Sequence, residues 1–78
     1  MDYQMEKWQR QDWRKGTKHY CCELKQDLFG RWILLRRWGR VSAFHGQSLE
    51  EVCDRYEDGV KTFEAVARRR AKRGYHCW

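Results

Sequence analysis

The chain has 78 residues, a formal net charge of +6 and 41% hydrophobic residues, with five tryptophans and no proline. A chain of this length forms one domain, and it buries only about 60–65% of the surface that its unfolded form exposes, which leaves little room for an enclosed catalytic cleft. The aromatic content excludes a disordered chain. We therefore expect one folded domain over residues 1–78.

The positive charge is concentrated in two blocks. Residues 30–46 contain four arginines and no acidic residue, and residues 59–78 contain six basic residues and a single glutamate, whereas residues 47–58 between them are acidic. A polarised surface of this kind favours nucleic acid as a partner. We expect no membrane partner, because the N-terminus has no signal-peptide pattern and no apolar run approaches the length of a membrane span.

The first half of the chain reads as paired strands. Residues 2–13 fit a strand and a helix equally, and residues 14–17 read as a loop because a glycine follows a charge pair. Residues 18–25 alternate apolar and polar side chains as a strand does. Residues 26–30 form a connection of hairpin length, so this strand and the next should pair antiparallel.

The stretch Arg31–Val41 is the longest apolar-rich run and predicts a central strand. With a side-chain period of two, one face carries Trp32, Leu34, Arg36, Trp38 and Arg40, and the other carries Ile33, Leu35 and Val41. We expect the C-terminal helix to bury the second face. The first face, in which indole alternates with guanidinium, suits phosphates, sugars and bases. The alternative is a half-buried strand whose arginines are merely solvated.

The next segment carries a local helix signal. Ser48 and Glu51 form a capping box, and helical spacing relates Leu49, Val52, Cys53 and Tyr56. The local pattern therefore predicts a helix over residues 49–57, because the same residues alternate less cleanly as a strand.

A C-terminal helix is predicted over Asp58–Lys72, with Asp58 as the N-cap and Gly74 as the left-handed residue that ends it. Its apolar stripe consists of Val60, Phe63, Val66, Ala67 and Ala71. Five cations crowd its end: Arg68, Arg69, Arg70, Lys72 and Arg73. Each cation stabilises the helix by only about 0.3–1 kcal/mol through its interaction with the helix dipole, and like charges repel one another. We therefore expect some of these cations to bind a partner rather than only to form a solvated helix end. Residues 75–78 can fold back on the sheet.

The four cysteines are Cys21, Cys22, Cys53 and Cys77. Without a secretory signal we expect reduced thiols in the cytoplasm. Adjacent strand residues point to opposite faces, so Cys21 and Cys22 cannot chelate one ion, and the spacing of cysteines and histidines matches no zinc pattern. The sequence also has no nucleophile elbow or phosphate loop. We expect no metal, no cofactor and no catalytic residue, and hence no enzyme.

A signature centred on Trp38-Gly39-Arg40 resembles the WGR domain family. The matching segments, in the family's order over residues 18–75, are His19-Tyr20, Leu28-Phe29-Gly30-Arg31-Trp32, Arg37-Trp38-Gly39-Arg40-Val41, Gly46-Gln47 and Arg73-Gly74-Tyr75. The resemblance implies an α+β fold, an antiparallel β-sheet with one C-terminal α-helix packed across it. It also places residues 47–56 in the sheet, against the local pattern, and we follow it there.

The family is best known within eukaryotic poly(ADP-ribose) polymerases, where the domain binds DNA at strand breaks and signals to a catalytic domain. The resemblance implies a similar binding role for this chain. Small stand-alone bacterial proteins are similar. In the family, the Trp and Arg of the motif contact the terminal nucleotide and the neighbouring domain, and the resemblance implies these roles for Trp38 and Arg40. This chain departs from the family at Ser42, where a glycine is usual, so the loop at residues 42–45 can take a different path. We expect no attached catalytic domain, so signalling would need a separate partner protein.

We therefore predict a monomeric, non-catalytic module that binds nucleic acid, DNA ends or nicks before RNA. The predicted binding residues are Trp38, Arg40, Arg36, Arg37, Arg69, Arg70 and Arg73. Alternatively, Trp38 belongs to the core and Arg40 pairs with Glu50 or Glu51. The alternative function is a protein-interaction adaptor that docks through residues 50–58 or the Trp-Arg face, and a third is assembly as a homo-oligomer.

Overall fold

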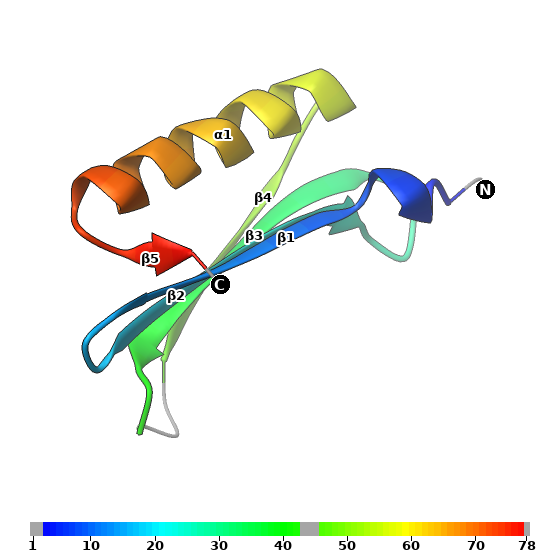
Figure 1. Ribbon diagram of the computed structural model, residues 1–78. Coiled ribbons are helices and arrows are strands. Elements are labelled where there is room, and N and C mark those ends of the chain that lie inside the picture. Colours follow the sequence, from blue (N-terminus) through cyan, green and yellow to red (C-terminus); the bar gives the residue numbers. More distant parts are fainter. Residues whose placement is uncertain (1–2, 43–45, 78) are drawn as a thin grey trace.

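The computed structural model describes residues 3–42 and 46–77. Its elements are the 3-10 helix η1 (Met5–Lys7), the strands β1 (Gln9–Lys15), β2 (Lys18–Gln26), β3 (Trp32–Arg40) and β4 (Gln47–Val52), the helix α1 (Tyr56–Lys72) and the strand β5 (His76–Cys77). The strands form one antiparallel sheet in the order β4-β3-β2-β1-β5, and α1 crosses one face of it (Figure 1). The predicted α+β fold is confirmed.

Strand β2 lies in the middle of the sheet and pairs with both β1 and β3. The register sets Tyr20 opposite Trp13 on one side and opposite Trp38 on the other. Directly opposed residues share a face, so three aromatic side chains stand in a row across the sheet.

The core lies between α1 and the sheet face that carries Leu24 and Leu34, which are both fully buried. Its buried members are Trp13, Tyr20, Cys22, Leu24, Leu34, Phe63 and Val66, and the half-buried Trp32 and Trp38 pack against them. The helix therefore covers the face of β3 that was predicted to be exposed, and the prediction that it covers Ile33, Leu35 and Val41 is wrong.

The error has a physical reason. The face that a helix covers is decided by the summed apolar area of all strands, not by one strand. The neighbouring strands contribute Trp13, Tyr20 and Leu24 to the face of Leu34, and this aromatic and aliphatic area exceeds what Ile33 and Leu35 supply.

The conflict over residues 47–57 is resolved in favour of a strand as far as Val52, which pairs with Ile33. The helix then begins at Tyr56, so the prediction that Asp58 is its N-cap is wrong. Tyr56 packs on Trp32 with ring centroids 4.7 Å apart, and this contact accounts for the earlier start. Asp58 falls in the first turn instead, where its charge still favours the positive end of the helix.

The end of α1 follows the prediction. Gly74 has a φ of +87°, and its N–H donates to the Ala71 carbonyl while that of Tyr75 donates to Arg70. This left-handed residue reverses the chain, so that β5 pairs with β1 and the fold-back is confirmed through Cys77. Within the described part of the chain, no helix is long and apolar enough to cross a membrane.

Candidate nucleic-acid interface

Trp38 stands near the end of β3, on the face that α1 covers. Its ring stacks on Tyr20 with centroids 5.9 Å apart and planes 14° apart, and its Nε1 donates to Gln47 Oε1 at 3.1 Å. The start of β4 approaches closely here, because a Cβ at Gly46 would lie 2.7 Å from the Trp38 carbonyl oxygen. The Gly-Gln segment therefore packs on the backbone of Trp38 through Gly46 and holds its indole through Gln47.

A hollow of about 300 Å³ opens beside this indole between β2, β3 and the end of α1. Its lining residues are Tyr20, Arg36, Trp38, Arg70, Arg73 and Tyr75. The structure thus brings together four of the seven predicted binding residues. Pockets that bind small molecules measure about 300–1,000 Å³, so this hollow has room for a single nucleotide-sized group and not for a duplex.

Arg70 is held between two tyrosine rings. Its guanidinium carbon lies 4.5 Å from the centroid of Tyr20 and 5.2 Å from that of Tyr75, which are cation–π distances. Its Nε is buried and has no hydrogen-bond acceptor among the described residues. A buried donor without an acceptor costs about 1–3 kcal/mol. The fold therefore accommodates this arginine at a cost, which is common at functional sites.

Arg36 lies on the same face and is bound to an acid of β4. Its Nη2 is 2.8 Å from Glu51 Oε1, while its Nε is also buried without an acceptor in the described part of the chain. The carboxylate offsets part of the positive charge of the hollow, so Arg36 is a weaker phosphate ligand than a free arginine would be.

A second hollow of about 310 Å³ adjoins the first and shares Trp38 and Tyr75 with it. The other lining residues are Lys18, His19, Gly39 and Arg40. Arg40 is exposed. Among the described residues no ion pair joins Arg40 to Glu50 or Glu51, and Glu51 is bonded to Arg36 instead. The alternative pairing of Arg40 is therefore not what the structure shows, whereas Trp38 does pack against the core while it remains half-buried.

Two predicted residues lie outside these hollows. Arg37 points to the opposite face, because neighbouring strand residues alternate, and it is bonded there to Glu23. Arg69 is exposed on α1 and lines neither hollow. The structure therefore does not gather all seven residues at one site.

Sequence reasoning missed two aromatic residues of the site. Tyr20 was predicted only as a strand and signature residue, and Tyr75 only as part of the signature and of the fold-back over residues 75–78, although both lie against Arg70. The position of Tyr20 could have been derived by counting back across the predicted hairpin, since antiparallel pairing about residues 27–31 sets it opposite Trp38. Tyr75 gave no such signal, because its place depends on the turn at Gly74.

The cysteines are not part of the site. Cys21 and Cys22 point to opposite faces, as expected, and both are buried. Burial raises the pKa of the Cys21 thiol to about 11 and that of Cys22 to about 12. Among residues 3–42 and 46–77, no three side chains of His, Cys, Asp or Glu converge as a metal site would require.

Comparison with known proteins places the chain in a family. The family model of the WGR domain matches residues 2–78. The chain is 36% identical over 62 residues to the "Uncharacterized protein y4dW" of Sinorhizobium fredii (strain NBRC 101917 / NGR234), a match that covers 80% of this chain but 30% of that protein. No solved structure matches the chain. WGR domains are in general non-catalytic modules that bind nucleic acid or other proteins, and this chain belongs to the WGR domain family.

Proposed function

We propose that this protein binds DNA at ends or nicks through the two hollows on either side of Trp38, which we call the tryptophan interface. Its residues are Lys18, Tyr20, Arg36, Trp38, Arg40, Arg70, Arg73 and Tyr75. The observation that carries the proposal is a half-buried indole flanked by arginines in a nucleotide-sized space. Aromatic rings stack on bases and sugars, and guanidinium groups bind phosphate through two parallel hydrogen bonds.

The size of the hollows favours an interrupted duplex over an intact one. In a continuous helix every base is stacked on both sides, so none offers a free face to an indole. A nick or an end exposes one base pair and its sugar without opening the helix. Single-stranded DNA and RNA also present free bases, which makes RNA the second candidate.

The exposed cations would hold the flanking phosphates. Arg40 and Arg73 lie at the rims of the two hollows and are exposed, and Lys18 adds a third charge beside Arg40. Arg69 extends the positive field along α1, whereas Arg37 on the opposite face acts only at long range. We expect a monomeric protein that acts in the cytoplasm.

Fluorescence anisotropy with labelled oligonucleotides tests this function. A nicked duplex, a blunt duplex, a single strand and a duplex closed by hairpins at both ends should be compared at low salt. We expect the closed, unbroken duplex to bind most weakly. If about four phosphates are neutralised, log affinity should fall against log salt with a slope of about −3.6.

Trp38→Ala is the decisive variant, and Trp8→Ala is its matched control. Both remove a half-buried indole, but Trp8 lines neither hollow. Loss of stacking removes about 1–3 kcal/mol, so Trp38→Ala should weaken binding by roughly 5- to 150-fold without changing the salt slope. Equal effects of the two variants, or no binding of any oligonucleotide by the wild type, would refute the proposal.

A further inference from the structure

Strand β4 ends the sheet, and its outer side pairs with no strand in the described part of the chain. The hydrogen bond from the Cys53 N–H to the Trp32 carbonyl, at 2.8 Å, fixes the direction of its backbone groups. In an antiparallel pair, alternate residues bond to the partner strand and the residues between them point away from it. In the register of β4 with β3, the N–H and carbonyl groups that point to the open edge are those of Ser48, Glu50 and Val52.

This edge lacks most of the features that prevent a further strand from pairing. Natural edge strands are often very short, bulged, covered by another segment, or protected by lysine or proline. β4 has six residues, pairs with β3 in an unbroken register and contains no lysine or proline. Leu49 and Val52, on opposite faces of β4, are 46% and 54% exposed. The edge therefore offers apolar contacts as well as backbone hydrogen bonds.

The charge at the edge is negative, although the whole chain carries a net charge of +6. Glu50 lies in β4, Asp54 follows the strand, and Glu57 lies in the first turn of α1. All three are exposed, and none has an ion-pair partner among the described residues. Carboxylates at an edge oppose the addition of an acidic strand and favour a basic one.

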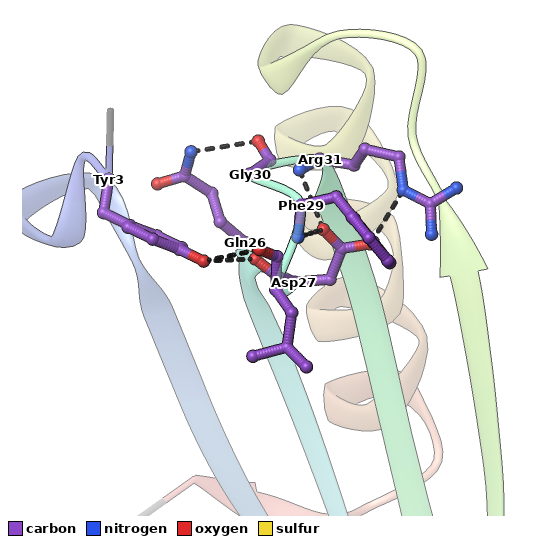
Figure 2. Close-up of polar contacts among 7 residues, drawn as sticks. Tyr3, Gln26, Asp27, Phe29, Gly30 and Arg31 are labelled. Carbon is purple, nitrogen blue, oxygen red and sulfur yellow. Dashed lines mark hydrogen bonds and ion pairs between the residues drawn. The ribbon is translucent and has the colours of Figure 1, made fainter. Parts of the chain in front are cut away.

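The nearest arginines do not cancel this charge, because each is already paired with another carboxylate of the chain. The pairs are Arg36–Glu51, Arg37–Glu23, Arg55–Asp58 and Arg31–Asp27. Figure 2 shows the last pair, in which Arg31 Nε donates to Asp27 Oδ2 at 2.8 Å. Lys25 is separated from β4 by β3, and Lys61 lies beyond the first turn of α1. The three free carboxylates therefore keep the edge acidic.

We propose that β4 accepts an antiparallel strand from a partner protein, with a basic residue opposite Glu50 and an apolar residue beside it, opposite Leu49. Main-chain hydrogen bonds supply the affinity of such an added strand, and its alternating side chains supply the specificity. Antiparallel pairing continues the pattern of the sheet. The partner segment therefore alternates apolar and basic residues. The proposal does not depend on DNA binding, because no residue of the tryptophan interface lies in β4.

Charge argues against a second copy of this chain as the occupant. Two β4 strands related by a two-fold axis would bring two identical acidic edges together. The two chains, each with a net charge of +6, would also repel each other as a whole. A basic strand instead places opposite charges across the new strand pair, which stabilises it.

Fluorescence anisotropy with three labelled peptides tests the proposal on the full chain. The first peptide alternates valine and arginine over about eight residues, a common strand length. The second has glutamate in place of arginine, and the third keeps the arginines but carries N-methyl groups on alternate backbone amides, so that it cannot donate to a strand edge. We expect the first to bind and the other two to bind at least tenfold more weakly. Equal binding of the N-methylated peptide would show that charge alone attracts the first, and would overturn the proposal.

Amide hydrogen exchange locates the added strand without a variant. The N–H groups of Ser48, Glu50 and Val52 should exchange quickly in the free protein, and the basic peptide should slow the exchange of all three. Unchanged exchange at saturating peptide would contradict strand addition. Slow exchange in the free protein, together with sedimentation as a dimer, would show that a second copy occupies the edge and would also overturn the proposal.

Two variants of β4 separate the backbone from the charge. Ser48→Pro removes an outward N–H but leaves the carboxylates and the hydrogen bonds to β3 in place, and Glu50→Lys reverses the central charge. Each should weaken binding of the basic peptide at least tenfold, and Ser48→Pro should still bind a nicked duplex. Glu64→Lys, with the same change of charge at an exposed position of α1, is the matched control. Wild-type affinity in both β4 variants, or an equal loss in the control, would refute the assignment.

Discussion

Glu51 is bonded directly to the tryptophan interface, and its neighbour Glu50 provides a close control. Glu51 accepts from Arg36, whereas Glu50 pairs in register with Leu35 and so lies on the opposite face of the sheet. Glutamine at either position removes one negative charge, so only the position of the lost charge differs. We expect Glu51→Gln to tighten DNA binding and Glu50→Gln to leave it almost unchanged.

The size of the effect follows from Coulomb's law. A carboxylate about 10 Å from a bound phosphate repels it by about 0.4 kcal/mol in bulk water and about 1.7 kcal/mol at an effective dielectric of 20. Removal of this repulsion by Glu51→Gln should therefore tighten binding by roughly two- to fifteenfold at low salt. The gain should shrink as salt rises, because the screening length at 0.1 M is also about 10 Å.

Anisotropy titrations of both variants with a nicked duplex, at low and at physiological salt, measure this difference. Loss of the half-exposed Arg36–Glu51 ion pair should lower the free energy of unfolding by about 1 kcal/mol or less, which a urea titration checks. An equal gain in both variants would show that net charge alone drives binding. Weaker binding by Glu51→Gln would show that Arg36 must be held by this carboxylate, and either result refutes the reasoning.

Three further predictions concern the fold. Gly59→Ala should lower the free energy of unfolding by about 1 kcal/mol in a urea titration. The new Cβ would lie 2.6 Å from a methyl carbon of the fully buried Leu24, and this overpacking outweighs the gain in helix propensity. A higher free energy of unfolding would contradict this prediction. Iodoacetamide at pH 8 should modify the exposed Cys77 but not Cys22, whose pKa of about 12 leaves almost no thiolate, as intact-mass measurements would show. Gln26→Leu should lower the free energy of unfolding by about 2 kcal/mol, because the Gln4 N–H, the Trp8 indole N–H and the Gly30 carbonyl lose their hydrogen-bond partner. An unchanged urea midpoint would show that these hydrogen bonds do not stabilise the fold.

The sequence predicted the fold class, the antiparallel hairpin and the helix end at Gly74, because each depends on local patterns or on the family signature. The sequence-based predictions were wrong where contacts between distant segments determine the structure. The face buried against α1 depends on what β1 and β2 contribute beside Leu34, and the start of α1 depends on the contact between Tyr56 and Trp32. Neither is visible in a single strand or helix.

The candidate site was likewise predictable only where it depends on the local pattern of one strand. Alternation along β3 separated Trp38 from Arg37 in advance, and the structure agrees. The ion pair between Arg36 and Glu51 could not be predicted, because it depends on the strand register. The cation–π contacts of Arg70 with two tyrosines could not be predicted either, because they depend on how the helix crosses the sheet.

The most direct test of the central claim uses the tryptophans as reporters. The five indole N–H groups each give one signal in a proton–nitrogen correlation spectrum, and a nicked duplex can be titrated into the labelled protein. Because Trp38 lies in the proposed interface and Trp8 lies at an apolar hollow on the other face, we expect the Trp38 signal to shift most and the Trp8 signal to stay in place. A shift of Trp8 with Trp38 unmoved, or no shift at saturating DNA, would contradict the account.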